Sequence, residues 1–587
     1  MRTLLPSLGL VATMLLAGGC FDPTRACTSD GDCVAGGRCD PGTKTCISGS
    51  NPNDRTPPVF SIAVAPPAAR RSTAKLTELD PASPDGGVDA FRRDESVVVT
   101  VSSQDRDVDA GSVRLVVSGV SNNPTTSLES QLGPCTSGSP GAGAPFCGQA
   151  AVALGSLPFD AFRGVMVLEV SGSDLSNNVG KADGGINVTR WKWRYSAGAP
   201  IYTTPAIADD GTIVFGTSDG GSGSLYALTP EGDEKWAPIA LGEIKASPVI
   251  GTLDGGPQLV YVGIGSSAGK ILAVNLAEGV SVASCPPGAS TYAGPFIGSP
   301  TLVTSGAGQL EGVLALASGT KLVNIRPAAS GADPTCITTD TPATQAFASN
   351  VVAQGLQSFL ATAEGLVRAF TLDSGNWVKN GSWGSGLGYV GVGDRAIQSV
   401  ALTPSTVFGT TSLRGAFSLD VVSGGLTSNF PSGGLLADPG GISITAEEEI
   451  FGSGVSTPAL LYSVAPGAGS GNTETLSGPL VGTAAVGAGG FVYVGTLTGT
   501  LEAHSATATT IWTSPMGATE SFLASPTIAC GDSGAAQSGA LLLASTSGSL
   551  FAVLVDSPGL DPTAPWPKYQ HDVRNTGNPT TPIQSCP

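Results

Sequence analysis

Histidine and charged side chains are scarce in this sequence. Among 587 residues there are two histidines, His504 and His571, and charged residues make up 13%, against about a quarter in ordinary domains. Zinc sites and general acid–base catalysis rely heavily on histidine. His504 lies where the first repeat of the chain has Leu228, and His571 lies beside Asp572 in a distinctive tail, so we interpret both as structural. The sequence therefore predicts no enzyme, no catalytic residue and no cofactor.

Positive charge and long apolar runs are also in short supply. Lysine and arginine total 28 against 46 aspartates and glutamates, which gives a net charge of −18. Affinity for nucleic acid comes largely from neutralising phosphates with Lys and Arg, so the balance argues against nucleic acid as a partner. The acidity is interpreted as a solubility feature. The apolar stretch Leu4–Leu16 is broken by Pro6 and is too short to span a bilayer.

Residues 1–19 have the pattern of a signal peptide. The apolar stretch is followed by Ala17-Gly18-Gly19-Cys20. These residues resemble a bacterial lipobox, with Leu16 one position earlier than the usual leucine, and the resemblance implies cleavage before Cys20 and lipidation of that residue. Phe21, in place of aspartate, favours the outer membrane. We expect a lipid-anchored protein of the bacterial cell envelope, facing the periplasm or the surface; plain secretion with Cys20 as a spare thiol is the alternative.

The 11 cysteines fit an exported chain. Lipidation of Cys20 leaves 10, and an even number in an exported protein indicates disulfides. Four cysteines between residues 27 and 46 allow three pairings, among which the sequence cannot choose. A zinc site is disfavoured there because the stretch has no Cys-x-x-Cys and no nearby histidine. The disulfide candidates are Cys27, Cys33, Cys39, Cys46, Cys135, Cys147, Cys530 and Cys586.

The cysteine-rich stretch and the propeller cysteines are interpreted separately. The stretch from residue 27 to 46 resembles the small Dickkopf-type cysteine-rich motif of secreted myxobacterial lipoproteins. Cys530 and Cys586 are expected to tie the tail to the last repeat. Cys285 and Cys336 receive no role from the sequence.

Residues 20–58 are the lipidated Cys-rich segment with a linker, and residues 59–187 are expected to form an immunoglobulin-like β-sandwich. Short β-branched runs alternate there with loops rich in Asp, Gly and Asn. One loop contains Asp105, Asp107 and Asp109, an oxygen-rich spacing that makes it a weak calcium candidate. The loop departs from the EF-hand pattern, so a solvated acidic turn is the favoured interpretation and no metal site is predicted.

Residues 188–580 repeat one pattern at a period in the forties. Short apolar strands and glycine turns at such a period indicate the blades of a β-propeller. Matched glycines recur 47 residues apart at Gly216 and Gly263, and 43 apart at Gly409, Gly452 and Gly495.

Eight units can be counted, so we expect a mainly-β protein with an eight-bladed propeller. The fourth unit matches least, and seven blades is the alternative. The strand 190–196 precedes the first unit and is expected to join the eighth, which would close the ring. Residues 581–587 form a C-terminal tail. The units open at Thr204-Pro205, Ser247-Pro248 and Ser299-Pro300, near Ser349, Ser399, Gly441 and Gly482, and at Ser525-Pro526.

Three runs of the first repeat, Asp210–Gly216, Leu225–Leu228 and Lys235-Trp236, and the tail Pro565–Asn578 resemble the pyrroloquinoline-quinone-like propeller repeat. That family holds quinone-dependent alcohol dehydrogenases and non-catalytic propellers, including the outer-membrane assembly lipoprotein. The enzymes need an adjacent Cys-Cys pair, which this chain lacks. The resemblance therefore implies the non-catalytic class and transfers no site residue.

We expect a cell-envelope lipoprotein whose propeller is a protein-binding or scaffolding module, with the membrane as anchor and an envelope protein as partner. A quinone-dependent dehydrogenase is one alternative, disfavoured by the missing motifs. Surface adhesion or carbohydrate binding through the sandwich is another and would make a glycan the ligand. Propellers carry varied sites, so the fold alone does not choose among these functions.

Overall fold

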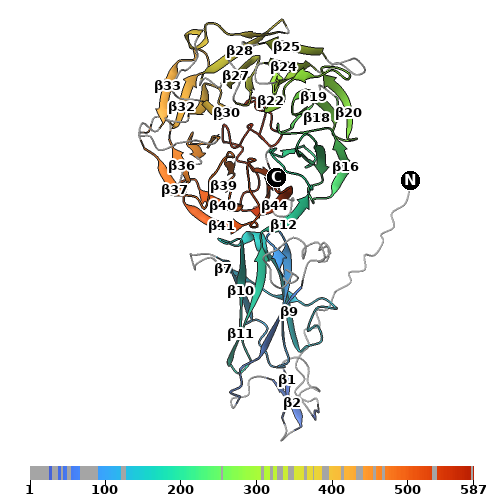
Figure 1. The fold of residues 1–587 in the computed structure, drawn as a ribbon. Coiled ribbons are helices and arrows are strands. Elements are labelled where there is room, and N and C mark those ends of the chain that lie inside the picture. Colours follow the sequence, from blue (N-terminus) through green and yellow to red (C-terminus); the bar gives the residue numbers. More distant parts are fainter. Residues whose placement is uncertain are drawn as a thin grey trace, which may run out of the picture.

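The chain folds into a disc of sheets that stands on an elongated β-sheet body (Figure 1). A hairpin of β1 (Gly37–Asp40) and β2 (Thr45–Ser48) lies at the far end of that body. The elements are strands apart from two 3-10 helices in the described part of the chain, η2 (Leu154–Ser156) and η4 (Trp383–Gly386). The computed structural model describes residues 26–28, 37–40, 44–48, 54–65, 90–120, 127–252, 256–305, 310–317, 321–326, 335–340, 349–362, 366–374, 376–386, 396–411, 415–430, 441–453, 458–465, 468, 470–531, 538–583 and 586.

Two sheets packed face to face form the elongated body. One has the order β3-β5-β9-β8 and the other β4-β11-β10-β6-β7. Alternate residues of β5 and β10, such as Val99 and Leu168, point into one shared core between the sheets. The body is therefore a β-sandwich. Its strands are β3 (Phe60–Ala65), β4 (Phe91–Arg92), β5 (Ser96–Ser103), β6 (Arg114–Ser118), β7 (Ser127–Ser130), β8 (Gly133–Pro134), β9 (Phe146–Ala153), β10 (Arg163–Ser173) and β11 (Val179–Thr189).

The disc is a mainly-β propeller, as the sequence predicts. Eight antiparallel sheets, seven of four strands and one of five, follow one another along the described part of the chain, and we number them blades 1 to 8. Blades 1 to 4 are β13 (Ala206–Ile207), β14 (Ile213–Gly216), β15 (Ser224–Leu228) and β16 (Glu234–Ala240); β17 (Val249–Thr252), β18 (Gln258–Ile264), β19 (Ala268–Asn275) and β20 (Val280–Cys285), with β21 (Tyr292–Ala293) paired to β19; β22 (Phe296–Thr304), β23 (Leu310–Ala317), β24 (Lys321–Arg326) and β25 (Thr335–Asp340); and β26 (Val352–Gln354), β27 (Gln357–Ala361), β28 (Val367–Asp373) and β29 (Asn376–Lys379).

The second half of the ring repeats this arrangement. Blades 5 to 8 are β30 (Ala396–Leu402), β31 (Thr406–Thr411), β32 (Gly415–Asp420) and β33 (Leu426–Phe430); β34 (Ser443–Ile444), β35 (Ile450–Ser453), β36 (Leu460–Val464) and β37 (Asn472–Thr475); β38 (Ala485–Gly487), β39 (Phe491–Gly495), β40 (Thr500–Ser505) and β41 (Thr510–Pro515); and β42 (Thr527–Ala529), β43 (Gly539–Ala544) and β44 (Ser549–Val555) with β12 (Trp191–Ser196).

Blade 8 is completed by a strand from the other end of the propeller sequence. The order of its sheet is β12-β44-β43-β42, and β12 runs antiparallel to β44 with Trp191 opposite Val553 and Ser196 opposite Ser549. The strand expected to close the ring therefore does so. Because β12 covers the outer edge of β44, blade 8 has four strands like its neighbours.

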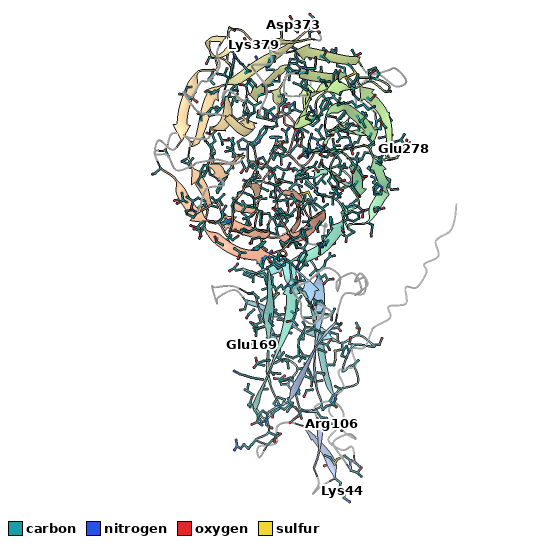
Figure 2. The ribbon with its side chains drawn as sticks, viewed as in Figure 1. Lys44, Arg106, Glu169, Glu278, Asp373 and Lys379 are labelled. Carbon is teal, nitrogen blue, oxygen red and sulfur yellow. A yellow bond between two sulfur atoms is a disulfide. The ribbon has the colours of Figure 1, made fainter. Side chains whose placement is uncertain are left out.

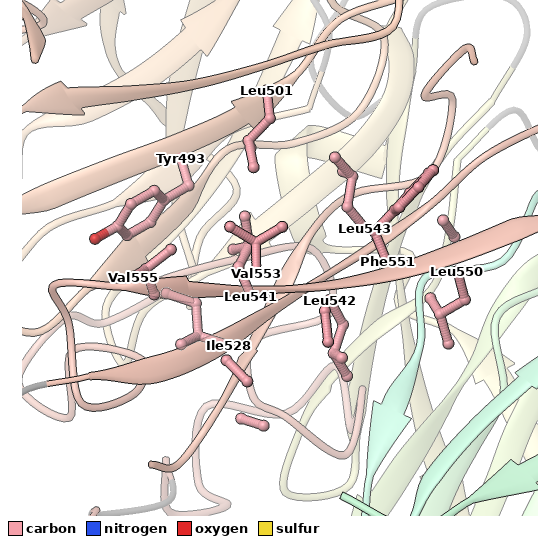
Figure 3. Close-up of a cluster of buried hydrophobic side chains, with 14 of the residues drawn as sticks. Tyr493, Leu501, Ile528, Leu541, Leu542, Leu543, Leu550, Phe551, Val553 and Val555 are labelled. Carbon is pink, nitrogen blue, oxygen red and sulfur yellow. The ribbon is translucent and has the colours of Figure 1, made fainter. Parts of the chain in front are cut away.

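Burial follows the position of a strand within its blade. The strands β43 and β44 are buried along their whole length, because neighbouring blades cover both of their faces. Figure 3 shows Leu541, Leu543, Phe551 and Val553 in this cluster. Outer strands such as β16 alternate between exposed and partly buried residues instead. Continuous apolar runs in the inner strands and mixed runs at the rim are what this geometry requires.

Tryptophans of the repeat fasten some of the blades to the next. Trp193 donates its indole N–H to the carbonyl of Pro230 at 2.9 Å, and Trp236 donates to Leu276 at 3.2 Å. Each ring lies over a glycine turn: a Cβ on Gly232, whose φ is +84°, would stand 2.8 Å from the Trp193 ring. The repeated Trp and Gly therefore form one contact, made between blades 8 and 1 and again between blades 1 and 2.

Candidate functional site

The segment Pro565–Asn578, which we call the tail from here on, runs along the axis of the propeller and pairs with the innermost strands. The backbone N–H groups of Ile207 and Ile250 donate to the carbonyls of Val573 and Arg574 at 2.7 and 3.0 Å. Leu302, Ala353, Ile444 and Val486 make the same contact with tail carbonyls in blades 3, 4, 6 and 7. The edge of an innermost strand that faces the axis has backbone N–H groups without a partner in its own sheet, and these hydrogen bonds satisfy them. The tail is therefore a plug shared by most of the blades.

Amide side chains of the tail satisfy the carbonyls of the same strands. Asn575 Nδ2 donates to the carbonyls of Thr204 and Pro248, at 3.0 Å each, and thereby bridges blades 1 and 2. Asn578 Nδ2 donates to the carbonyl of Leu302 at 3.0 Å. A buried carbonyl without a partner is costly, so these amides explain why the tail is rich in asparagine.

Two buried ionisable groups hold the plug in shape. Lys568 Nζ donates to the carbonyls of Tyr569 and Asp572, at 2.7 and 2.9 Å, and to Asn575 Oδ1. Burial lowers the pKa of Lys568 to about 7, although Asp572 opposes the shift. Burial opposes ionisation of Asp572 as well, yet His571, Arg574 and the Thr576 hydroxyl hold the pKa of this carboxyl well below its usual range.

The His571–Asp572 pair noted in the sequence lies inside this plug. His571 Nδ1 is 3.5 Å from Asp572 Oδ2, and the His571 ring packs against Trp566 with the ring centres 5.2 Å apart. Asp572 also accepts the hydroxyls of Thr576 and Thr581 at 2.6 and 2.7 Å. Both side chains are buried, and their contacts are with the tail and with Thr581 just after it. The geometry is that of a structural pair.

His504 lies in a separate buried cluster in blade 7. Its Nε2 is 3.3 Å from Glu502 Oε2, and Glu502 accepts the Ser477 hydroxyl at 2.6 Å. Burial opposes ionisation of Glu502, but His504 and Ser477 lower the pKa of the carboxyl overall. The side chains of His504 and Glu502 are at most 1% exposed, so the cluster joins β40 of blade 7 to the connection that follows β37 of blade 6.

A belt of hydroxyl groups surrounds the axis next to the plug. The Thr204 N–H donates to the Ser247 hydroxyl at 2.9 Å, and the Ser247 N–H donates to the Ser299 hydroxyl at 2.9 Å. The Thr483 N–H donates to the Ser525 hydroxyl at 2.7 Å, and the Ser525 N–H donates to the Thr204 hydroxyl at 3.2 Å. We call Thr204, Ser247, Ser299 and Ser525 the hydroxyl belt. It links blades 7, 8, 1, 2 and 3 across the point of ring closure.

The belt lines a cavity of about 280 Å³, which we call the axial pocket. Tyr569 of the plug forms part of its wall and donates its hydroxyl to Ser299 at 2.9 Å. Lys245 is the one charged residue of the lining, and its Nζ lies 2.7 Å from Glu243 Oε1. The lining consists of Tyr202, Thr204, Lys245, Ser247, Gly298, Ser299, Ser349, Asn350, Gly441, Val481, Gly482, Thr483, Leu523, Ala524, Ser525 and Tyr569.

Sequence reasoning did not recognise this pocket. Its lining includes the Ser or Thr of the Ser/Thr-Pro pairs that open several repeats, and in the sequence these pairs marked only where each unit begins. The hydroxyl that these positions share was the signal that could have indicated the pocket. A Gly-x-Ser-x-Gly run, Gly216 to Gly220, also went unrecognised. It connects β14 to β15 rather than a strand to a helix, and its Ser218 donates to Glu243 at 2.7 Å. Ser218 of this run therefore supports Glu243, the residue that contacts Lys245.

The cysteines are brought together in four pairs among the described residues. They are Cys27–Cys39, Cys135–Cys147, Cys285–Cys336 and Cys530–Cys586. Cys285–Cys336, which the sequence left unassigned, joins the outer strands β20 and β25 of neighbouring blades. Cys530–Cys586 joins the residues that follow the tail to the segment after β42. Cys20 and Cys33 lie outside the described residues, and only the backbone of Cys46 is described.

The acidic loop of the sandwich does not gather its own three carboxylates. Asp107 lies with Asp54 and Asp174, and their ligand atoms are within 4.8 Å of one another. Asp105 instead accepts the Val59 N–H at 2.7 Å, and Asp109 accepts a backbone N–H within its own turn. Burial and the like charges of Asp174 and Asp54 raise the pKa of Asp107.

Comparison with known proteins gives similarities of structure only. No protein-family model matches the chain, and no curated protein matches it in sequence. Similar solved structures include BamB from Moraxella catarrhalis (12% identity, 62% of this chain and 99% of that chain, TM-score 0.43) and Sqt1 from Saccharomyces cerevisiae (10%, 62% and 98%, TM-score 0.49). The computationally designed protein Ika8 is a third (12%, 61% and 98%, TM-score 0.44). The propeller assignment itself rests on the sheet order of this chain.

The described residues include no helix of the length and apolarity that crossing a membrane would require.

Proposed function

We propose that this chain is a lipid-anchored protein of the bacterial cell envelope whose propeller is a non-catalytic module that binds a protein partner. One observation carries the proposal: the chain's own tail lies along the axis where the blades meet, and Lys568, His571 and Asp572 are bonded within the tail. The large surfaces left for recognition are the rim and the two faces of the disc. Flat and edge surfaces of β-sheets recognise peptides and proteins through backbone pairing and side-chain pockets.

The mounting of the propeller supports a role in holding a partner at a fixed place. Strand β11 of the sandwich leads through Arg190 directly into β12, the strand that closes the ring. Arg190 is fully buried, pairs with Asp556 of the propeller and lies over the rings of Phe159 and Trp512. Arg93 of the sandwich reaches Asp556 at 3.5 Å as well. Buried hydrogen bonds and ion pairs of this kind hold the propeller in a fixed orientation relative to the sandwich.

The sandwich is proposed to be an immunoglobulin-like spacer. Its first sheet pairs β3, β5, β9 and β8, and its second places β11, β10 and β6 side by side. In chain order these match strands A, B, E and D in one sheet and G, F and C in the other, which is the immunoglobulin arrangement. A spacer of this type would hold the propeller away from the membrane to which Cys20 anchors the chain.

Site-specific photocrosslinking in the native bacterium tests the proposal. A photoreactive residue is placed at an exposed rim position, Val280, Val378 or Leu426, or at Val179 of the sandwich as the matched control. Figure 2 shows that labelled side chains such as Glu278 and Asp373 point outward from the same rim. A propeller-binding partner gives the same envelope protein from one or two rim positions and nothing from Val179.

The opposite pattern would overturn the assignment. Crosslinks confined to Val179 would move recognition to the sandwich, and their absence at every position would favour a glycan ligand. Two further measurements test the other parts of the proposal. Cys20→Ser is expected to release the protein from the membrane fraction, and added quinone with calcium is expected to give no dye reduction with alcohols.

A further inference from the structure

The wall of the axial pocket is unusually rich in hydrogen-bond donors. Each hydroxyl of the belt already accepts a backbone N–H from the preceding blade, and Ser299 accepts the Tyr569 hydroxyl as well. A hydroxyl has one hydrogen to donate. For Thr204, Ser247, Ser299 and Ser525, no acceptor of that hydrogen is present among the described residues. These side chains are 2 to 4% exposed and belong to residues that line the cavity, so a hydroxyl hydrogen that rotates toward the cavity can be donated to a ligand there.

The charges around the pocket favour an anion. Among the described residues, Lys245 is the only charged residue of the lining, which includes no described aspartate or glutamate. Glu243 contacts the Lys245 ammonium at 2.7 Å, and the Ser218 hydroxyl and Lys245 together lower the pKa of Glu243. An ammonium has three N–H groups, so this pair positions Lys245 and leaves it able to donate to a ligand. The Lys245 side chain is 53% exposed, which places it where a ligand can reach it.

Backbone bonds fix these donors before any ligand arrives. Each belt hydroxyl is held by an N–H of the neighbouring blade, and the plug supports the belt through Tyr569. Preorganised donors favour negative oxygen, because hydrogen bonds to an ionised acceptor are about twice as strong as neutral ones. A cationic ligand would meet the same row of O–H groups and the Lys245 ammonium, so the wall discriminates by charge.

We propose that the axial pocket binds a carboxylate group. A volume of about 280 Å³ suits a small carboxylate-bearing molecule or a single acidic side chain. In the second case the inference rests on the proposed function, because the protein partner would supply an Asp or Glu side chain. The hydroxyls of the belt and of Thr483 would donate to the carboxylate, and Lys245 would contact it at the rim.

Direct titration of the purified full-length protein tests the proposal. The probes are succinate, an acetylated Gly-Glu-Gly amide, and succinamide as the uncharged analogue of the first. Binding of succinate or of the peptide, together with at least about 10-fold weaker binding of succinamide, is the expected result. Succinate alone would identify a free solute as the source, and the peptide alone an acidic side chain. Equal affinity for succinamide, or binding of neither carboxylate, would overturn the proposal.

Two variants remove donors without breaking a hydrogen bond of the belt. Lys245→Met removes the cation, and Thr483→Val removes a lining hydroxyl while keeping its shape. Ser358→Ala is the matched control, because Ser358 is equally buried in blade 4 and does not line the pocket. We expect about 10-fold weaker binding for Lys245→Met, a smaller loss for Thr483→Val and no change for Ser358→Ala.

A variant that melts like the wild type yet binds the carboxylate undiminished would contradict the assigned donors. These measurements need no partner protein, so a failure here leaves the crosslinking result intact. The reverse also holds: binding of succinate with no protein crosslinks would keep the pocket and reject the protein partner.

Discussion

The repeated blades and the two segments that flank them are stabilised in different ways. A blade such as blade 1 is built from four consecutive strands with a local apolar interior. Trp–Gly locks and hydroxyl-belt bonds join it to the two adjacent blades. The flanking segments, β12 with Arg190 and the tail, make contacts across hundreds of residues. They also contain the buried ionisable groups Arg190, Lys568 and Asp572. The repeat therefore specifies the blade, and non-repeating sequence specifies the ring.

Deletion of β12, residues 191–196, should lower the free energy of unfolding more than any other change to the blades or to the flanking segments considered below. It exposes the outer edge of β44 and removes Trp191 and Trp193 from the largest apolar cluster of the ring. We expect a loss of more than about 5 kcal/mol, comparable with the whole stability of a domain, measured by thermal or denaturant unfolding. Trp193→Ala, which keeps the strand but removes the lock, should cost about 3–5 kcal/mol. An unchanged melting transition after the deletion would show that the ring does not depend on its closing strand.

Asp572→Asn should have an intermediate effect that depends on pH. Asp572 accepts hydroxyl and backbone donors of the tail, and its pKa in the folded protein lies below the ordinary value of 3.8. Its contribution is therefore complete above about pH 4 and is lost as the pH falls through the folded pKa. We expect the variant to lose about 2–3 kcal/mol at pH 7, with the difference from wild type shrinking in acid.

Asp561→Asn is the control for this measurement, because in the described part of the chain the Asp561 carboxylate accepts hydrogen bonds only from Thr563 in its own turn. Unfolding curves at pH 7 and at pH 3 provide the data. A difference between Asp572→Asn and wild type that stays constant down to pH 3 would mean that the carboxylate charge is not what stabilises the plug.

The blades were predictable from sequence, and the site was not, for the same physical reason. Gly216 recurs in register because a Cβ there would lie 2.3 Å from Ile244, and similar crowding at Gly263, Gly409, Gly452 and Gly495 makes the period visible. The strand 190–196 was predictable because the eighth unit lacked a fourth strand. The role of Asn575 could not be read, since its two carbonyl partners belong to blades 1 and 2 and no spacing in the sequence relates them.

The hydroxyls at the openings of the repeats could not be predicted as a site, because their contacts are made between blades rather than within a repeat. Ser247 and Ser299 are close in register, but only the closed ring places one blade's N–H against the next blade's hydroxyl. The grouping of Asp107 with Asp54 and Asp174 likewise joins three separate loops. Local pattern predicts elements, whereas convergence at an axis or at a sheet end depends on tertiary packing.

Substitutions inside the repeat should have the smallest effects on the free energy of unfolding. They should also distinguish the contribution of the hydroxyl belt from that of ordinary blade packing. Ser247→Ala removes the acceptor of the Thr204 N–H and leaves that buried donor without a partner, which should cost about 1–3 kcal/mol. Ser358→Ala is the comparison, because the Ser358 hydroxyl is fully buried and has no hydrogen-bond partner in the described part of the chain. Removing an unsatisfied hydroxyl should be neutral or slightly stabilising. Denaturant unfolding of both variants measures the difference, and equal losses would mean that the belt contributes nothing beyond ordinary blade packing.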